Sequence, residues 1–94
     1  MLDLTEILVL DTDIVLRGVG NKYWALNTKN GNQYQLNEVS YFMLEVFRKP
    51  TDIKTLIDVM LSEYKVERKR LEADCDTFID YATHKNILKK EVQL

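Results

Sequence analysis

The sequence contains one cysteine, one proline and three glycines among 94 residues, and a single histidine. Cys75 has no partner for an intramolecular disulfide, and with His84 as the lone histidine a zinc site of the Cys/His type is excluded as well. Gly18-Val19-Gly20 lacks the residues that complete a phosphate-binding loop, so we interpret it as a turn. The low proline content argues against a disordered chain. The sequence therefore predicts a folded protein without a cofactor or a metal.

Long apolar runs are also missing. No segment approaches the ~20 apolar residues that cross a bilayer, and the first ten residues lack the features of a secretory signal. We therefore expect a cytoplasmic protein without membrane contact. The formal net charge is −2, whereas proteins that bind phosphate backbones usually carry a basic excess, so nucleic acid is disfavoured as a partner. The length suits one domain over residues 1–94, with its core at about 7–88 and a polar tail at 89–94 that is expected to fray.

Alternating and β-branched residues predict strands in the first third of the chain. The runs at 7–10, 14–17, 23–26 and 33–36 have extended character and are separated by turn-forming segments. The step Asn30-Gly31 is typical of a hairpin turn. In the last strand Tyr34 and Leu36 share one face, and glutamines occupy the other. This polar face indicates an edge strand that is partly exposed.

Apolar residues then recur at helical spacing along two stripes, the first with Val39, Phe42, Met43, Val46 and Phe47 and the second with Ile53, Leu56, Ile57, Met60, Leu61 and Tyr64. Asn37 is expected to cap a first helix that ends at or before Pro50, and Thr51 is expected to cap a second helix. A third helix is predicted to start near Glu67 and to end at Asn86, which tolerates the left-handed conformation. The predicted fold class is α+β, with a three-stranded antiparallel sheet followed by three helices in a winged helix-turn-helix-like order.

No group of residues in the sequence predicts catalysis. Glu72, Asp76 and Asp80 recur every four residues on one side of the third helix, which is typical of a solvated face. Cys75 lies on the apolar side of that helix, where a cysteine usually behaves as a small hydrophobic residue. Trp24 lies in an alternating strand, and we expect it to pack in the core rather than to stack on a ligand. We therefore expect a protein that is not an enzyme.

From about residue 22 to residue 88, short segments occur in an order and spacing known from one family. They are Tyr23 to Asn27, Gly31, Tyr34 to Glu38, the residues Ile57, Leu61 and Tyr64, then Leu71 to Asp74 with Phe78-Ile79, and finally Ile87-Leu88. With these segments the chain resembles the PqqD-like family of peptide chaperones, which are recognition elements for ribosomally synthesised and post-translationally modified peptides. The segment Arg48-Lys49-Pro50 departs from the Asp-Gly that the family commonly has after its first helix.

The resemblance implies a three-stranded sheet against three helices and a peptide-binding function. Family members bind the leader segment of a precursor peptide antiparallel to the third strand, in a groove shared with the third helix. They present it to a maturation enzyme, often a radical SAM enzyme. Matched to this binding mode, the candidate peptide-binding residues in the strand are Asn32, Gln33, Tyr34, Gln35 and Leu36. On a helical wheel of the third helix, Arg70, Asp74, Thr77 and Tyr81 form a stripe beside the core positions Leu71 and Phe78, so these four and Phe78 are the candidates there. A free strand edge can add a peptide through main-chain hydrogen bonds, which agrees with the exposed strand predicted above.

Other function classes stay open. The basic cluster Arg68-Lys69-Arg70 at the start of a third helix would suit a winged-helix DNA-binding regulator, although acidic residues on the same helix oppose it. An apolar face of the third helix could instead dock permanently on a partner protein. A free edge strand can also pair with a second copy, so we expect a monomer or a weak homodimer. The sequence does not decide which flank of the third helix faces a groove.

Overall fold

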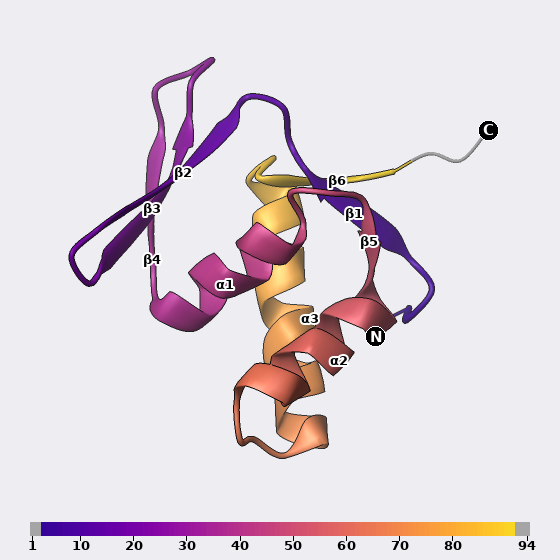
Figure 1. Ribbon diagram of the computed structural model, residues 1–94. Helices are drawn as coiled ribbons and strands as arrows, with labels where there is room; N and C mark the ends of the chain where they lie inside the picture. Colours follow the sequence, from indigo (N-terminus) through magenta and orange to yellow (C-terminus); the bar gives the residue numbers. More distant parts are fainter. Residues whose placement is uncertain (1–2, 92–94) are drawn as a thin grey trace.

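Two small antiparallel sheets lie on either side of helix α1 in the computed structural model, which describes residues 3–91 (Figure 1). The first sheet consists of β2 (Ile14–Val19), β3 (Lys22–Asn27) and β4 (Gln33–Leu36). The second sheet consists of β1 (Ile7–Leu10), β5 (Thr51–Asp52) and β6 (Leu88–Lys90). The helices are α1 (Glu38–Val46), α2 (Ile53–Glu63) and α3 (Arg68–His84). The prediction of an α+β fold with three helices after the first strands is confirmed over the described residues.

The hairpin between β3 and β4 is organised by one buried asparagine. The Asn27 N–H donates to the Asn32 carbonyl oxygen at 2.8 Å. The Asn27 side-chain Oδ1 accepts from the backbone N–H of Lys29 at 2.9 Å and of Asn30 at 3.2 Å. Gly31 has a φ of +79°, in the left-handed region that favours glycine. The turn predicted from Asn30-Gly31 is therefore confirmed, and β3 lies between β2 and β4.

The second sheet joins segments that are far apart in the sequence. The sequence predicts a strand at 7–10, but not that this strand pairs antiparallel with both β5 and β6. Leu8 lies opposite Thr51 on one side and opposite Lys90 on the other. The expectation of a frayed tail from residue 89 is thus wrong for Lys89 and Lys90, because their backbone groups pair with β1. Residues 92–94 of that tail lie outside the described residues.

Four of the five predicted helix boundaries are confirmed, and α1 ends at Val46, before Pro50. The Asn37 side chain accepts a hydrogen bond from the Ser40 N–H at 2.7 Å and so caps α1. Helix α3 starts directly after Glu67, and its end is followed by Asn86 with a φ of 60°. Both residues were recognised because the conformational preference of an asparagine is local, and packing elsewhere in the chain does not alter it.

The cap of α2 differs from the prediction by one residue. The Asp52 side chain accepts from the Thr55 N–H at 2.6 Å, whereas Thr51 was expected to cap. Thr51 is held in strand β5, and its hydroxyl donates to the Lys49 carbonyl oxygen at 2.8 Å. The pairing of Thr51 with β1 is a long-range contact, so the sequence around the helix start does not reveal it.

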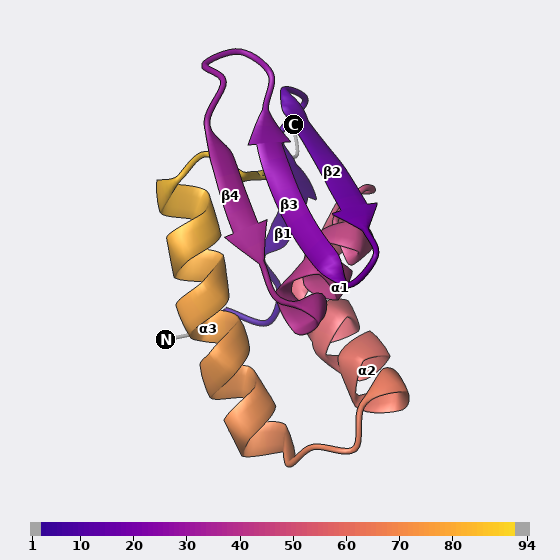
Figure 2. The ribbon, with the colours of Figure 1, turned by 90° about the vertical axis from the view of Figure 1, so that its left-hand side faces the viewer.

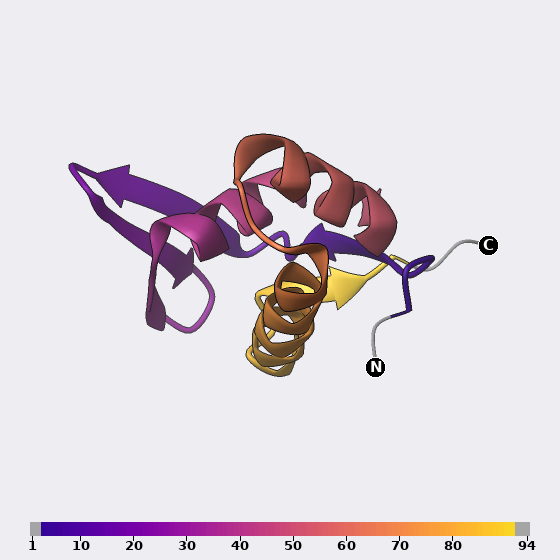
Figure 3. The ribbon, with the colours of Figure 1, turned by 90° about the horizontal axis from the view of Figure 1, so that it is seen from below.

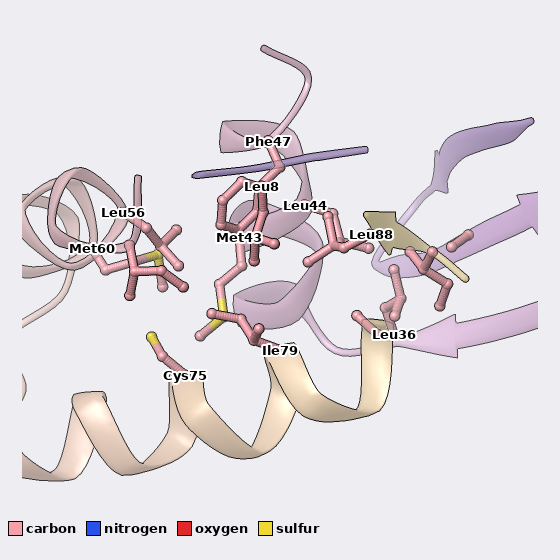
Figure 4. Packing of buried hydrophobic residues seen from close by; sticks show 14 of the residues in the cluster. Leu8, Leu36, Met43, Leu44, Phe47, Leu56, Met60, Cys75, Ile79 and Leu88 are labelled. Atoms are coloured by element: carbon pink, nitrogen blue, oxygen red, sulfur yellow. The ribbon is translucent and has the colours of Figure 1, made fainter. Parts of the chain in front are cut away.

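One core joins the helices to both sheets (Figure 4). Its fully buried members come from every layer and include Leu8, Met43, Leu44, Phe47, Ile53, Leu56, Ile57, Met60, Cys75, Ile87 and Leu88. The stripe predicted on α2 is buried at four of its positions. On α3 the buried residues are Leu71, Cys75, Ile79 and Ala82. Because these four residues point into the core, the opposite side of α3 faces outwards.

The face of β3 that enters the core is the opposite of the one expected. Trp24 was expected to pack inside, but Ala25 is fully buried, and Trp24 is only half-buried and does not pack against the core. The ring of Tyr23, next to Trp24 and on the inner face, lies 4.6 Å from the ring of Tyr41 on α1, measured between centroids. Alternation predicts which residues share a face, but it does not say which face turns inwards.

Candidate peptide-binding site

The outer edge of β4 has backbone groups that no strand of the described residues uses. β4 is at the end of its sheet, and Asn27 and Asn32 form a hydrogen-bonded pair. In an antiparallel ladder such pairs alternate with pairs that are not hydrogen-bonded. The register therefore directs the N–H and C=O groups of Tyr34 and Leu36 towards β3. Those of Gln33 and Gln35 point outwards, where an added strand can meet them.

Asn32 is different from the other strand residues named above. Its carbonyl oxygen accepts from Asn27, and its N–H donates to the Asn30 side chain at 2.9 Å. Both backbone groups are thus already used inside the hairpin loop, and β4 itself begins at Gln33. Of the five strand residues proposed for peptide binding, Gln33 and Gln35 are therefore the two whose backbone groups point outwards. This distinction depends on the register of β4 with β3, which the position of the strand in the sequence does not give.

A hollow of about 570 Å³ lies between α1 and α3, beside Asn37, the residue that follows β4. Its lining residues are Asn37, Val39, Ser40 and Met43 from the start of α1, and Asp74, Thr77, Phe78 and Tyr81 from α3. Asn37 follows β4 directly, so the strand ends at the hollow. The ring centroids of Phe78 and Tyr81 are 6.3 Å apart, and the two rings form an aromatic wall on α3. This wall offers apolar surface to a side chain of an extended peptide.

A second hollow of about 460 Å³ continues along α3 towards the start of that helix. Its lining residues are Val39, Met60, Tyr64, Lys65, Val66, Glu67, Arg70, Leu71 and Asp74. Val39 and Asp74 line both hollows, so the two form one groove beside α3. Charges of both signs surround an apolar floor at this end, which suits a peptide better than a polyanion.

All five residues predicted on α3 line this groove. Arg70 lines the second hollow, Asp74 lines both, and Thr77, Phe78 and Tyr81 line the first. The structure therefore brings them together on the flank of α3 that adjoins the end of β4. Figure 2 shows the strands in the order β4, β3, β2 with increasing distance from α3. Figure 3 shows α3 nearly along its axis, on the same side of the molecule as the hairpin.

The α1 side of the groove was not foreseen. Val39 was assigned to the buried stripe of the first helix, yet its side chain is 36% exposed and lines both hollows. Tyr64 and Val66, after α2, were also missed as lining residues. Val39 is in the first turn of α1 and Val66 lies in the loop between α2 and α3, so helical periodicity does not distinguish either of them as a groove residue. Only the packing of α1 against α3 identifies them.

Cys75 belongs to the core and does not line the groove. Cys75 is fully buried, and burial, followed by the negative charges of Asp74 and Glu72, raises the pKa of its thiol to about 11. Its thiolate, which would be the nucleophile, is therefore disfavoured at neutral pH, and the expected core role of Cys75 is confirmed. Within residues 3–91 no three His, Cys, Asp or Glu side chains are grouped to hold a metal ion. Nor does a helix in that range have the length and apolarity to cross a membrane.

The fold and the groove define a class: a small α+β domain with an open strand edge beside a helix-walled groove. The family model described as "Coenzyme PQQ synthesis protein D (PqqD)" matches residues 14–88, which is most of the chain. The chain therefore belongs to the PqqD family, as its resemblance indicated. No curated protein matches it.

Two solved structures have a similar fold. "TbiB1 in Complex with the TbiA(beta) Leader Peptide" is 18% identical, with a TM-score of 0.77, over 90% of this chain and 99% of that one. "Lasso peptide synthetase B1 complexed with the leader peptide" is also 18% identical, with a TM-score of 0.74, over 87% of this chain and 96% of that one. At this identity the likeness concerns the fold.

Proposed function

We propose that this chain recognises the leader segment of a ribosomally synthesised precursor peptide and presents it to the enzyme that modifies the peptide. The leader is added to β4 as an antiparallel strand and is held against α3. The chain itself does no chemistry in this role. Its membership of the PqqD family supports the proposal, as do the two solved structures of similar fold, each of which is a complex with a leader peptide.

The observation that carries the proposal is the position of a free strand edge at the mouth of a groove. Gln33 and Gln35 direct their backbone groups outwards, and the next residue beyond the strand that contacts the groove is Asn37. Strand addition uses main-chain hydrogen bonds for affinity and nearby pockets for the alternate side chains. Both requirements are met within a few residues of each other.

The direction of β4 predicts how the leader lies. An antiparallel partner enters beside Leu36 and leaves beside Gln33, and both hollows adjoin the Leu36 end. Leader residues at the beginning of the added strand, or just before it, are therefore expected in the hollows near Phe78 and Arg70. Residues that follow the strand leave near the hairpin loop and continue to the segment that is modified.

The proposal extends to the partner enzyme, the location and the oligomeric state. The modifying enzyme is expected to be a radical SAM enzyme, since the family often serves such enzymes, and the expected location is the cytoplasm. A monomer or a weak homodimer is still expected. The genes that neighbour this one would identify the enzyme and the precursor peptide.

The DNA-binding alternative finds no support in the basic cluster that suggested it. Arg68 forms ion pairs with Asp58 at 3.8 Å and with Glu72 at 3.5 Å, so its charge is partly compensated. Asp74 and Asp80 lie further along the same helix and would repel phosphates. Leader recognition is the function that the site favours.

A pair of substitutions at Gln35 tests the proposed function. Gln35→Pro removes the outward N–H, and its ring occupies the edge, whereas Gln35→Ala keeps the backbone unchanged. The probe is a fluorescent synthetic leader of the precursor peptide encoded beside this gene, and the measurement is fluorescence anisotropy. We expect Gln35→Pro to weaken binding about tenfold or more, since it loses a hydrogen bond of about 1 kcal/mol and adds a steric conflict. Gln35→Ala should stay within about threefold of the wild type. Equal affinities of the proline variant and the wild type, with an unchanged circular dichroism spectrum, would exclude strand addition at β4.

A further inference from the structure

A second apolar surface lies on the outer face of the β2–β3–β4 sheet, on the side opposite the core. Trp24 and Leu26 point there, because Ala25 between them is fully buried. Trp24 lies opposite Arg17 on β2 and Leu26 lies opposite Val15, whose side chain is 48% exposed. Neither Trp24 nor Leu26 packs against the core. We call this surface, formed by Val15, Arg17, Trp24, Leu26, Gln33 and Gln35, the outer sheet face.

The charge of this region is opposite to that of the whole chain. Residues 14–36 contain Arg17, Lys22 and Lys29 and no acidic residue, although the chain as a whole has a net charge of −2. A partly exposed apolar patch with basic residues beside it complements an apolar surface with an acidic rim. Trp and Arg are the residue types that most often dominate binding energy at protein interfaces.

The outer sheet face is continuous with the edge that adds the peptide. Gln33 and Gln35 place their side chains on this face and direct their backbone groups to the added strand. A leader strand on β4 therefore extends the same face by one strand, and its alternate side chains join it. A protein that docks on this face touches the chain and the bound leader together. Such a protein would bind the loaded chain more tightly than the empty one.

We propose that the outer sheet face is the docking surface for the modifying enzyme, which meets it with an apolar patch rimmed by acidic residues. This inference rests on the proposed function and adds to it the surface through which the enzyme is engaged. Because leader and enzyme occupy different sides of β4, each contact can be removed without the other. Binding of the leader and of the enzyme is positively coupled, and by linkage the coupling is the same in both directions.

The test uses the purified modifying enzyme encoded in the same gene cluster and measures its affinity for the chain by biolayer interferometry, with and without saturating leader. Trp24→Ala should weaken enzyme binding at least tenfold, and Arg17→Glu should weaken it several-fold, more at low salt than at high salt. Lys49→Glu is the matched charge reversal, since Lys49 is an exposed residue between α1 and β5, and it should leave the affinity unchanged. Val15→Glu provides a second variant if Trp24→Ala does not fold. In all correctly folded variants the leader affinity should stay within twofold of the wild type.

The outcomes separate this inference from the proposed function. If the variants bind leader normally and also bind the enzyme like the wild type, the docking surface is wrong and leader recognition stands. If the wild-type chain loaded with leader shows no affinity for the enzyme, the docking surface is equally wrong. If Trp24→Ala abolishes a dimer seen by light scattering while enzyme binding persists, the outer sheet face binds a second copy of the chain and not the enzyme. If Arg17→Glu abolishes binding to duplex DNA while enzyme binding persists, the face binds DNA and not the enzyme. If the wild-type chain does not bind the leader, the proposed function itself fails.

Discussion

Strands β2 and β4 are the two edges of one sheet, and β4 is the edge that leads into the groove beside α3. By the register, β2 directs the backbone groups of Leu16 and Gly18 outwards, just as β4 directs those of Gln33 and Gln35. β4 leads into Asn37 and the hollow walled by α3, whereas β2 leads into the exposed turn at Gly20. A free edge supplies hydrogen bonds of no sequence preference, so discrimination requires side-chain pockets. The comparison indicates that the groove, not the edge alone, makes β4 a specific site.

The largest effect is expected on stability, when proline is introduced at position 34 of β4 instead of position 35. Tyr34→Pro removes an N–H that faces β3 and leaves its acceptor on β3 without a partner, so it should lower the free energy of unfolding by about 1–3 kcal/mol. Gln35→Pro removes an N–H that faces outwards and should lower the free energy of unfolding by about 1 kcal/mol or less. Urea unfolding followed by circular dichroism measures both. Similar losses of stability at the two positions would show that the assigned alternation of β4 is incorrect.

A smaller effect, on leader affinity, is expected when part of the aromatic wall beside β4 is removed. Removal of an exposed apolar side chain on β2 should have almost no effect. Tyr81 is 41% exposed and lines the first hollow, so Tyr81→Ala should weaken leader binding by about 1–2 kcal/mol, roughly five- to thirtyfold. The matched control is Val19→Ala at the end of β2, where the side chain is 61% exposed. It should change leader affinity less than twofold. Titration calorimetry with the synthetic leader measures both, and equal losses would mean that the two edges bind peptide alike.

The sequence predicted those features that depend on local preferences. Asn37 and Asn86 mark helix ends through their own side-chain and backbone properties, and Gly31 allows the left-handed turn conformation. The third helix and its five groove residues followed from periodicity combined with the family resemblance. The same periodicity identified Cys75 as a core residue, and burial confirms it.

Features that depend on contacts between distant segments were not predicted. The pairing of β1 with β5 and β6 joins residues more than 40 positions apart, and no local pattern specifies it. The placement of Thr51 in a strand and the inward turn of Ala25 follow from such packing. For the candidate site, the sequence located the strand but not the alternation of its backbone groups, which depends on the register with β3.

Amide hydrogen exchange in the presence of the leader measures the outward-facing backbone N–H groups on both edges of the sheet. We expect a saturating synthetic leader to slow exchange at Gln33 and Gln35 about tenfold or more. Exchange at Leu16 and Gly18 on β2 should change far less. If the leader binds with measurable affinity while the Gln33 and Gln35 amides exchange as in the free protein, the leader is not held as a strand on β4.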